Sequence, residues 1–477
     1  MIRSSLGQNG DCVRVEDASL RWTLTGGRLI AAADKLAWDF ARFVNRPLVL
    51  YMEKSDRYYA CLGSCFLHSI SFCPVDIGNP IKRLLEIAGQ LENSLIVTDD
   101  KLVEEELRKR GAACFLISNI LGVPESQPYL DKPDHGVARY FIATSGSTGV
   151  PKLVEIPHDR TVAFIKWAIQ FYQINDECRW AQFSSIGFDL SLVDFLAVLC
   201  GGGTLVSLSS NVDRLRPAKT VARMKITHWH SVPSMIPYFI QEKSIAGEQE
   251  SCRVFSFCGE PFLKSYAELL AKRYPFARII NTYGPTEGTL FCSYFEFHLD
   301  DRSISEPTLP IGQPIPSWNF VLLPENEFRR LVIVSDNIAN GYVGRKSELF
   351  STVKLFDKEM RAYDTGDYFL FSGAHLHFSH RLDGMVKVSG TRIDLGEIES
   401  AASRVGLTNP VAIAKNNSII LAAEGEARPF VEVSAELAEF LPEIYLPKKV
   451  VFFEHLPRTL NGKLDRRDIL NKIEADE

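Results

Sequence analysis

From Val254 to Glu287 the chain reads VFSFCGEPFLKSYAELLAKRYPFARIINTYGPTE, and the order of elements in this stretch decides the fold class. Residues 254–257 form a short apolar run, as expected of a buried strand, and residues 262–273 carry apolar side chains at helical spacing. Pro275 closes the helix, and residues 277–280 form a second apolar run. Strand, helix and strand in this order predict a βαβ unit with parallel strands and a right-handed crossover.

The ends of these two strands place polar residues where a ligand can bind. Open parallel sheets bind ligands beyond the carboxyl ends of their strands. Cys258 lies at the end of the first strand, and the loop NTYGPTE, residues 281–287, lies at the end of the second. A third loop, residues 144–152, also follows a strand-like run. The sequence therefore predicts three loops around one cleft, which is the expected active site.

The third loop reads TSGSTGVPK from Thr144 to Lys152 and has the composition of a phosphate-binding loop. Glycine lets backbone N–H groups turn toward an anion, the hydroxyls donate further hydrogen bonds, and Lys152 adds positive charge. A Walker loop has Ser or Thr after its lysine and opens a helix, whereas Leu153 and a strand-like run, residues 153–156, follow here. The alternative is a flexible hairpin tip of glycine and serine.

The composition is that of an ordinary globular protein. The 477 residues are 46% hydrophobic and 23% charged, the net charge is −6 and the isoelectric point is near 6.0. Without a long basic block, nucleic acid and anionic membranes are not expected as partners. Residues 1–12 lack the segments of a signal peptide, and no apolar run is long enough to span a bilayer. We therefore expect a cytoplasmic protein.

The ten cysteines, the last of which is Cys292, do not form a disulfide framework. Cys61, Cys65, His68 and Cys73 lie within one short stretch and could suggest a metal site. Their spacing lacks the paired pattern of zinc ligands, however, and the segment is largely apolar. We expect buried thiols instead, because free cysteine is among the most buried residue types.

A domain boundary is expected near Asp383, where a polar, glycine-punctuated stretch ends. The fold class predicted is α/β, or mixed α+β, with a large N-terminal domain of parallel and mixed sheets, residues 1–382. Residues 383–477 are predicted to form a small, mobile α+β lid. The further strand-like runs are residues 320–323 and 331–335 before the boundary and 385–388, 419–422 and 450–453 after it.

Five motifs, in this order, resemble those of the adenylate-forming superfamily. The motifs are TSGSTGVPK (144–152), NTYGPTE (281–287), YDTGD (363–367), RLDGMVKVSGTRIDLGEIE (381–399) and LPRTLNGK (456–463). Within the superfamily the chain is most similar to amino-acid adenylating enzymes, namely the adenylation domains of non-ribosomal peptide synthetases and D-alanine–carrier protein ligases. The resemblance covers almost the whole chain.

The resemblance implies that a substrate carboxylate attacks the α-phosphate of ATP, with release of pyrophosphate and formation of an acyl-adenylate. The charge between these anions must be stabilised, which lysine and Mg²⁺ can do. Glu287 is implied to hold Mg²⁺, Thr286 to meet the α-phosphate, and Lys463 to bridge the substrate carboxylate and the phosphate. The residues implied to bind ATP are Thr144, Ser145, Gly146, Ser147, Thr148, Gly149, Lys152, Asn281, Tyr283 (against adenine), Gly284, and Asp367 and Arg381 (at the ribose). Read without the motifs, Asp367 is a turn residue and Lys463 a solvated surface lysine.

The resemblance also implies a second half-reaction. After adenylation the small domain rotates about a hinge at Asp383, and the phosphopantetheine thiol of a holo carrier protein takes the acyl group as a thioester. No carrier domain is evident in the chain, so we expect a carrier protein in trans. The sequence leaves open which carrier and pathway are involved and what the oligomeric state is.

The segment GFDLS, residues 187–191, resembles the family segment whose aspartate, here Asp189, pairs with the substrate α-amino group. A buried ammonium needs such an anion. The alternative is an acid at the start of the helix that the apolar run 190–200 predicts. The implied pocket is apolar and tight, which predicts a small amino acid such as alanine, glycine or serine, of open stereochemistry. Its residues are Leu190, Val193, Ser231, Ser256, Cys258, Gly259, Thr282, Leu290 and Phe291.

Two other functions are considered, an acyl-CoA or aryl-CoA ligase of the same fold and a non-catalytic binding paralogue. Asp189 disfavours the first, and the joint presence of Glu287, Asp367 and Lys463 disfavours the second. The chain also departs from the family pattern. Only residues 340–342 remain of a glycine-rich segment, and His380 stands where glycine is usual. Because these departures affect docking surfaces and lid packing, it stays open whether the transfer to a carrier is intact.

Overall fold

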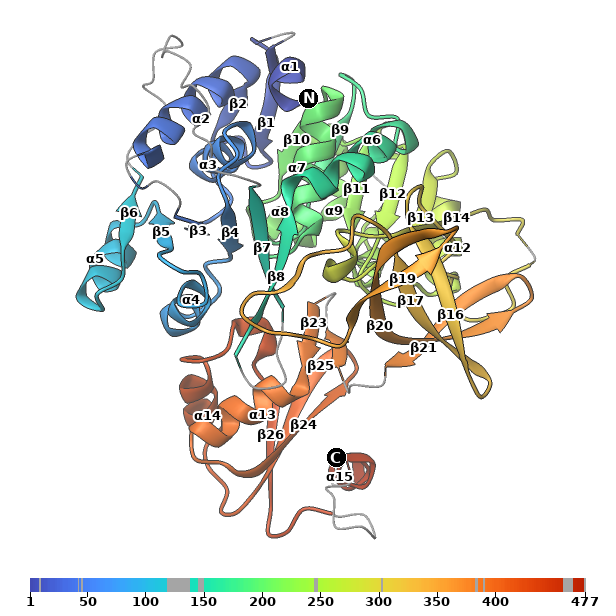
Figure 1. Ribbon diagram of the computed structural model, residues 1–477. Helices are drawn as coiled ribbons and strands as arrows, with labels where there is room; N and C mark the ends of the chain where they lie inside the picture. Colours follow the sequence, from blue (N-terminus) through green and yellow to red (C-terminus); the bar gives the residue numbers. More distant parts are fainter. Residues whose placement is uncertain are drawn as a thin grey trace.

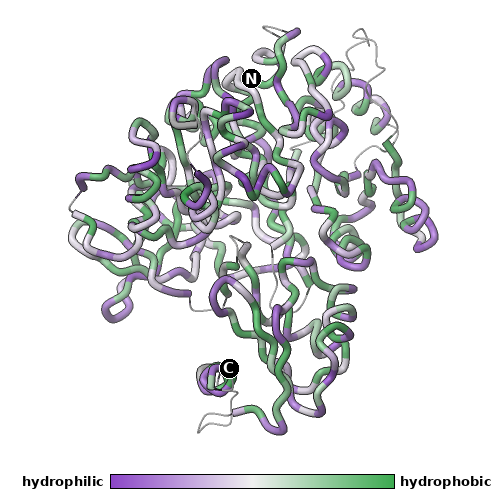
Figure 2. The backbone as a smooth tube through the Cα atoms, turned by 180° about the vertical axis from the view of Figure 1, so that it is seen from behind, coloured by the Kyte–Doolittle hydropathy of each residue, from purple (hydrophilic) through white to green (hydrophobic). Residues whose placement is uncertain are grey.

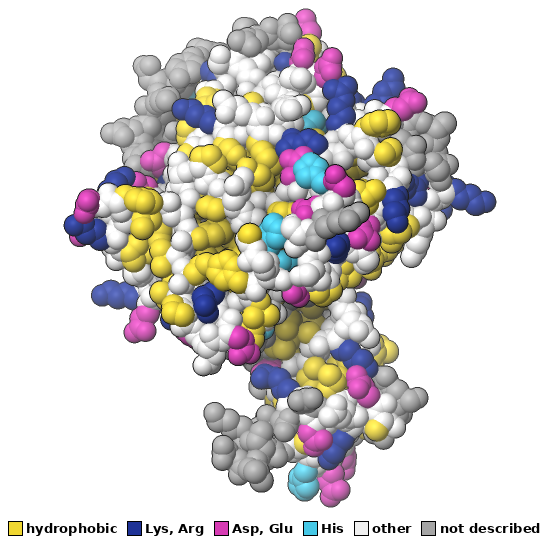
Figure 3. All heavy atoms as spheres, turned by 90° about the vertical axis from the view of Figure 1, so that its right-hand side faces the viewer, with side chains coloured by type: hydrophobic (Ala, Val, Ile, Leu, Met, Phe, Trp, Pro, Cys, Tyr) yellow, Lys and Arg dark blue, Asp and Glu magenta, His cyan; other side chains and the backbone are white. Residues whose placement is uncertain are grey.

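The computed structural model describes residues 1–7, 10–41, 43, 46–117, 138–144, 150–243, 248–301, 303–381, 385–388, 391–457 and 466–475. A large N-terminal domain and a small C-terminal domain follow one another along the chain (Figure 1). The space-filling view shows them as two bodies joined by a narrower neck (Figure 3).

A nine-stranded sheet runs through the large domain. Its order is β15 (Gln313–Pro314), β14 (Ser293–Phe297), β13 (Arg278–Tyr283), β12 (Val254–Phe257), β11 (His228–Ser231), β9 (Arg179–Gln182), β10 (Thr204–Ser207), β1 (Val13–Asp17) and β2 (Thr23–Thr25). The predicted βαβ unit is confirmed, since β12 and β13 are parallel and α12 (Lys264–Arg273) joins them. The helix begins two residues later than predicted because Leu263 is extended and pairs with Thr308.

A seven-stranded sheet lies beside the first. Its order is β18 (Gly341–Tyr342), β8 (Lys152–Pro157), β7 (Arg139–Thr144), β4 (Phe72–Val75), β3 (Leu48–Tyr51), β5 (Leu95–Thr98) and β6 (Cys114–Leu116). Strands β7 and β8 are antiparallel, with Thr144 opposite Lys152. The predicted phosphate loop therefore joins two strands, as its sequence indicated.

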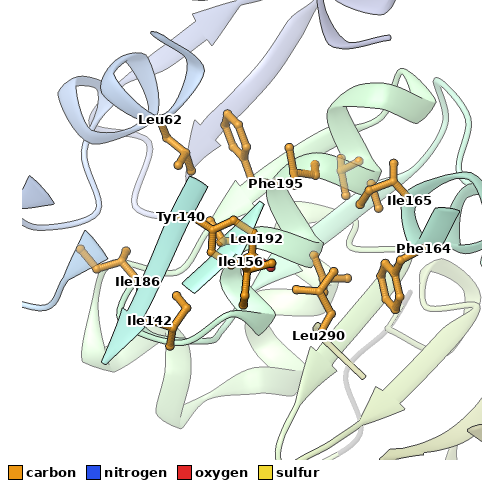
Figure 4. Close-up of a cluster of buried hydrophobic side chains, with 14 of the residues drawn as sticks. Leu62, Tyr140, Ile142, Ile156, Phe164, Ile165, Ile186, Leu192, Phe195 and Leu290 are labelled. Carbon is orange, nitrogen blue, oxygen red and sulfur yellow. The ribbon is translucent and has the colours of Figure 1, made fainter. Parts of the chain in front are cut away.

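Helices pack between and around these sheets, and α7 is the most buried of them. Every residue from Ser191 to Leu199 is buried, as expected of a helix that is apolar all round. Its Leu192 shares one buried cluster with Tyr140 of β7 and Leu290 (Figure 4). None of the described helices has both the length and the apolarity that a bilayer crossing requires. The helices of the large domain other than α12 are α1 (Ile2–Gly7), α2 (Gly26–Ala41), α3 (Asp56–Leu67), α4 (Ile81–Ala88), α5 (Lys101–Lys109), α6 (Thr161–Phe171), α7 (Leu190–Gly201), α8 (Asn211–Leu215), α9 (Pro217–Met224), α10 (Ile236–Gln241) and α11 (Glu248–Ser251), with short 3₁₀ turns at η1 (His158–Arg160), η2 (Pro233–Met235) and η3 (Thr286–Gly288).

An antiparallel sheet completes the large domain and brings two distant motifs together. It contains β16 (Asn319–Glu325), β17 (Phe328–Val334), β20 (Lys358–Ser372), β19 (Phe350–Leu355) and β21 (His375–Arg381). In the pairing of β20 with β21, Asp367 is opposite Arg381.

The small domain has its own sheets and its own core. Its strands are β22 (Met385–Val388), β23 (Thr391–Asp394), β24 (Thr408–Lys415), β25 (Ser418–Glu424) and β26 (Lys449–Phe453), and its helices are α13 (Leu395–Arg404), α14 (Phe430–Leu437), η4 (Glu443–Tyr445) and α15 (Arg466–Ala475). Figure 2 shows hydrophobic residues along these strands. The strand-like runs on both sides of the predicted boundary are confirmed as strands, with ends that differ by a residue or a few.

Helix α4 of the large domain contacts the small domain. Arg83 of α4 forms an ion pair with Glu397 of α13, and both side chains are buried. The guanidinium of Arg83 lies 5.3 Å from the ring centre of Tyr445, and Lys82 Nζ lies 3.6 Å from that of Phe440. Breaking a buried ion pair leaves a charge uncompensated, so this contact holds the small domain against α4.

The predicted burial of the thiols is confirmed, since seven of the ten cysteines are buried. Among them are Cys61, Cys65 and Cys73 of the short stretch that could have suggested a metal, and burial raises the pKa of all three thiols. His68 of the same stretch has its Nε2 atom 2.7 Å from an oxygen of Asp34. This arrangement supports the interpretation of the stretch as part of the core.

Candidate active site

A cleft opens at the carboxyl end of the nine-stranded sheet, and five residues of the predicted site line it. These are Gly259, Asn281, Thr282, Tyr283 and Gly284. Leu309 and Phe378 add apolar surface, so the walls suit a flat aromatic group. The carboxyl ends of β12 and β13 therefore meet as predicted, although β13 continues to Tyr283, three residues beyond the predicted strand. Residues 145–149 of the phosphate loop lie outside the described residues.

Asp367 stands at the centre of a buried polar cluster beside this cleft. The hydroxyl of Tyr283 and the guanidinium of Arg381 donate hydrogen bonds to different oxygens of Asp367. Arg381 also donates to the carbonyl of Thr365, at 2.9 Å. Burial, and then the charge of Asp367, raise the pKa of the Tyr283 hydroxyl. Asp367 is thus a buried strand residue rather than an exposed turn residue, and the sheet brings the two residues predicted at the ribose into contact.

Glu287 lies in the turn η3 after β13, and its side chain is buried. The hydroxyl of Tyr342 donates to it at 2.7 Å. Lys152 Nζ lies 5.6 Å from the ring centre of the same tyrosine, so Tyr342 connects the predicted metal ligand with the lysine of the phosphate loop. Tyr342 was not predicted as a site residue, although it belongs to the remnant of the glycine-rich segment. Mg²⁺ is commonly bound by one or two carboxylates together with substrate phosphates, and a buried carboxylate beside this loop fits that pattern.

Asp189 directly precedes α7, as expected of an acid at the start of a helix. Its burial and its hydrogen bonding, however, are those of a residue that binds a ligand. It is buried, and its Oδ2 atom has no hydrogen-bond partner among the described residues. Burial raises the pKa of its carboxyl to about 6, a hydrogen bond with Thr286 opposes that shift, and the charge of Glu287 adds to it. An incompletely satisfied buried carboxylate favours a cation as its ligand.

The apolar residues predicted for the substrate pocket come together beside α7. Val193, Cys258, Leu290 and Phe291 belong to one buried cluster, and Leu190 packs against it. Figure 4 shows Leu290 in this cluster with Phe164 and Leu192. Thr289 and Leu290 both have positive φ values, of 65° and 68°. Consecutive non-glycine residues in this region are strained, and such strain is typical of functional sites.

The three polar residues predicted for the pocket already have partners. Ser256 Oγ lies 2.9 Å from the hydroxyl of Tyr172, and Thr282 donates to the carbonyl of Phe257 at 3.0 Å. Ser231 accepts a hydrogen bond from the indole of Trp229, at 2.9 Å.

Alternation along β11 places Ser231 on the same side as Trp229, which belongs to a separate core cluster. The residue between them, His230, faces the other side, where its ring contacts Phe291. His230 was not predicted. The sequence contained a signal for it, because strand alternation puts only one of two neighbouring residues on the pocket side.

Gly284 offers a test of how tightly the loop after β13 is packed. A Cβ atom at this position would lie 2.5 Å from Phe291 Cα and 2.8 Å from the backbone nitrogen of Cys292. Backbone atoms cannot move aside easily, so Gly284→Ala is expected to lower the free energy of unfolding by about 3 kcal/mol. Urea denaturation would measure this, with Gly7→Ala as the control because nothing lies within 4 Å of its added Cβ. Equal midpoints for the two variants would contradict the packing described.

Two predicted residues with central roles, the hinge residue Asp383 and the catalytic lysine Lys463, lie outside the described residues. The helix that follows the lysine motif, α15, lies at the far end of the small domain from the large domain (Figure 1). The hairpin of β22 and β23 lies at the end of the small domain that is nearer the large domain (Figure 1).

Comparisons with known proteins agree on one family. Residues 14–343 match the family described as AMP-binding enzyme. The D-alanine--D-alanyl carrier protein ligase of Bacillus cytotoxicus is 30% identical over 460 residues, which cover 90% of each chain. The ligase of the same name from Listeria monocytogenes is 27% identical over 464 residues, which cover 90% of this chain and 89% of that one.

Solved structures of adenylation domains have the same fold. The Vibrio cholerae adenylation domain AlmE, in complex with glycyl-adenosine-5'-phosphate, superposes with a TM-score of 0.83 at 20% identity, over 99% of this chain and 97% of that one. Holo-PA1221, a non-ribosomal peptide synthetase protein with adenylation and peptidyl carrier domains, gives 0.81 at 21% identity, over 99% and 84%. At these identities the likeness is one of fold, and it confirms the predicted fold class.

Proposed function

Because this chain belongs to the AMP-binding enzymes, we propose that it uses ATP to convert a small amino acid into an aminoacyl-adenylate, and that it then transfers the aminoacyl group to the thiol of a separate carrier protein. The single observation that carries the amino-acid assignment is the buried carboxylate of Asp189, with its unpartnered oxygen. The α-ammonium of an amino acid supplies the missing cation. An acyl or aryl acid would leave that oxygen unsatisfied, at a cost of about 1–3 kcal/mol.

The nucleotide is proposed to bind across the cleft and the polar cluster beside it. The apolar and aromatic walls of the cleft suit the adenine ring, next to Tyr283. Asp367, held in place by Tyr283 and Arg381, can accept hydrogen bonds from the ribose hydroxyls. Lys152 and the loop before it are proposed to bind the β- and γ-phosphates. Fixing ATP in this way converts the attack on its α-phosphate into an effectively unimolecular step.

Two groups are proposed to stabilise the charge that develops during the attack. Glu287, positioned by the hydroxyl of Tyr342, would hold Mg²⁺, which would supply positive charge next to the leaving pyrophosphate. Thr286 is proposed to contact the α-phosphate, and its hydrogen bond to Asp189 would link the phosphate site to the ammonium site. Lys463 is proposed to neutralise the repulsion between the carboxylate and the α-phosphate.

Transfer to a carrier is supported by the names of the relatives and by the position of the small domain. The relatives named above are carrier protein ligases. The ion pair between Arg83 and Glu397 holds α13 against the large domain, with α15 turned away from it (Figure 1). We propose that this arrangement serves thioester formation and that rotation at Asp383 brings Lys463 to the site for adenylation. Dependence on ATP fits a cytoplasmic enzyme.

The proposed substrates are alanine, glycine and serine, in either configuration. Leu290 and Phe291 are both buried in the apolar cluster beside α7, and we propose that they leave little room for a side chain. One methylene group changes the discrimination by only about 1–3 kcal/mol, so related small amino acids should react at lower rates.

Pyrophosphate exchange tests this proposal directly. Labelled pyrophosphate is expected to enter ATP only when a small amino acid is present, and mass spectrometry should then detect the aminoacyl form of an added holo carrier protein. The panel contains both enantiomers of each amino acid, an aryl acid and a fatty acid. Exchange driven by the aryl or fatty acid, with transfer to free coenzyme A, would replace this proposal with an acyl-CoA ligase.

A further inference from the structure

A second buried carboxylate lies one and a half helical turns beyond Asp189. Asp194 of α7 is fully buried, and its Oδ1 atom lies 2.9 Å from His230 Nδ1. The indole of Trp180 donates to the same oxygen, also at 2.9 Å. His230 is itself fully buried. The three side chains form a polar group that no step of the proposed reaction uses.

The other nitrogen of His230 is left without a partner. An indole can only donate, so Asp194 Oδ1 acts as an acceptor, and we assign the imidazole hydrogen to Nδ1. In the neutral imidazole, His230 Nε2 is then an acceptor, and it is buried with no hydrogen-bond partner among the described residues. Leaving such a group unpaired is unfavourable.

His228, two residues earlier on the same strand face, shows that a histidine here can be fully satisfied. Its Nε2 atom lies 2.8 Å from the carbonyl of Tyr172, and its Nδ1 atom lies 2.8 Å from Thr227 Oγ1. His228 is therefore a matched control, since it has the same residue type, strand and burial but no free acceptor.

The ring that carries the free acceptor contacts Phe291, a residue of the predicted substrate pocket. The ring of His230 meets that of Phe291 edge to face, with 6.2 Å between their centres. In the sheet, His230 is paired with Ser256 of β12, another residue of the predicted pocket. The histidine therefore borders the space in which the side chain of the amino acid is expected.

Asp194 interacts electrostatically with His230 and, to a smaller extent, with Lys54, which donates to the carbonyls of Gln182 and Phe183 at 2.9 and 3.2 Å. The acceptor nitrogen of a neutral His230 suits an uncharged donor on the substrate. Among small amino acids, the side-chain group that can donate in this way is a hydroxyl.

On this geometry we propose that His230 is a specificity-determining residue, whose Nε2 atom accepts a hydrogen bond from a hydroxyl group on the substrate side chain. The inference rests on the proposed function and narrows the set of proposed substrates. A serine-like hydroxy amino acid becomes the preferred substrate, ahead of alanine and glycine. Asp194 acts through His230, as a positioning residue that holds the imidazole in one tautomer.

The first test compares serine with 2-aminobutyrate in pyrophosphate exchange with the unaltered enzyme. The two amino acids have nearly the same shape, and only serine carries a hydroxyl. The kcat/KM for serine is expected to be about 10–100-fold higher, because a site built for a hydroxyl penalises its absence. Equal values, or a preference for 2-aminobutyrate or alanine, would overturn the role of His230 and leave amino-acid activation standing. Absence of exchange with every amino acid would instead refute the proposed function.

The second test uses variants. His230→Leu is expected to remove the preference for serine over 2-aminobutyrate, whereas His230→Gln keeps an acceptor and should retain part of it. His228→Leu should leave the ratio unchanged, whatever its effect on the total rate. A ratio that is unaffected in His230→Leu would contradict the proposal. If that variant does not fold, His230→Gln and the comparison on the unaltered enzyme still decide the question.

Discussion

Asp189→Asn is expected to lose amino-acid-dependent pyrophosphate exchange and, at the same time, to gain stability. The proposed partner of Asp189 is the substrate ammonium, and both charges are desolvated when they meet. Removing one partner of a buried charge pair costs about 2–5 kcal/mol, which corresponds to a loss in kcat/KM of between ~30-fold and several thousand-fold. Most of that loss should appear as a raised KM for the amino acid, with the KM for ATP nearly unchanged.

The gain in stability follows from the pKa of the same group. The carboxyl has a pKa of about 6 in the folded protein against 3.8 for an ordinary aspartate, so the folded protein retains its proton to higher pH than the unfolded chain does. Stability is therefore lost as the pH rises from about 4 to 6, and the loss above pH 6 amounts to about 3 kcal/mol at most. Asparagine does not ionise, so the variant avoids this loss.

Urea denaturation at two pH values separates these effects. At pH 7.5 Asp189→Asn should be more stable than the unaltered protein by about 1–3 kcal/mol, and at pH 4 the difference should vanish. Asp176→Asn, an exposed acid on a surface loop, is the control and should change neither exchange nor stability. A variant that keeps full exchange, or that is less stable at pH 7.5, would remove Asp189 from the ammonium site.

Local pattern was enough to predict the elements that position the site. The run 254–287 predicted the βαβ unit because helix and strand periodicities differ, and because Gly259 and Pro275 lie on either side of its helix. The contact of Asp367 with Arg381 was predictable only through the resemblance. The two lie 14 positions apart along the chain, and the register of β20 with β21 places them opposite each other.

The remaining features depend on distant pairing, which a single sequence does not encode in an obvious way. Tyr342 reaches Glu287 because β18 pairs with β8, and Arg83 meets Glu397 across 314 positions of chain. Ser231 and His230 differ by one position, yet strand alternation sends their side chains to opposite faces. An assignment by motif that is off by a single residue therefore selects the wrong face.

Lys463→Ala is expected to separate the two half-reactions. If this lysine bridges the substrate carboxylate and the α-phosphate, its contact strengthens as charge develops in the transition state, and its removal lowers kcat for adenylation by about 10²–10³-fold. Equilibrium binding of ATP should change little. Transfer to the holo carrier should proceed at its normal rate when the aminoacyl-adenylate is supplied ready-made.

Two further variants complete this test, a neutral control and a variant in which the transfer step is expected to be the slower one. Lys472→Ala, at an exposed position on α15, should leave both steps unchanged. Arg83→Gln breaks the buried pair with Glu397 and should slow the transfer more than the adenylation, because that pair holds the small domain in the arrangement proposed for transfer. If the small domain rotates between the two steps, Lys463→Ala should impair mainly the adenylation and Arg83→Gln mainly the transfer. If Lys463→Ala and Arg83→Gln instead impaired both steps equally, the small domain would act in a single position and the proposed rotation would be wrong.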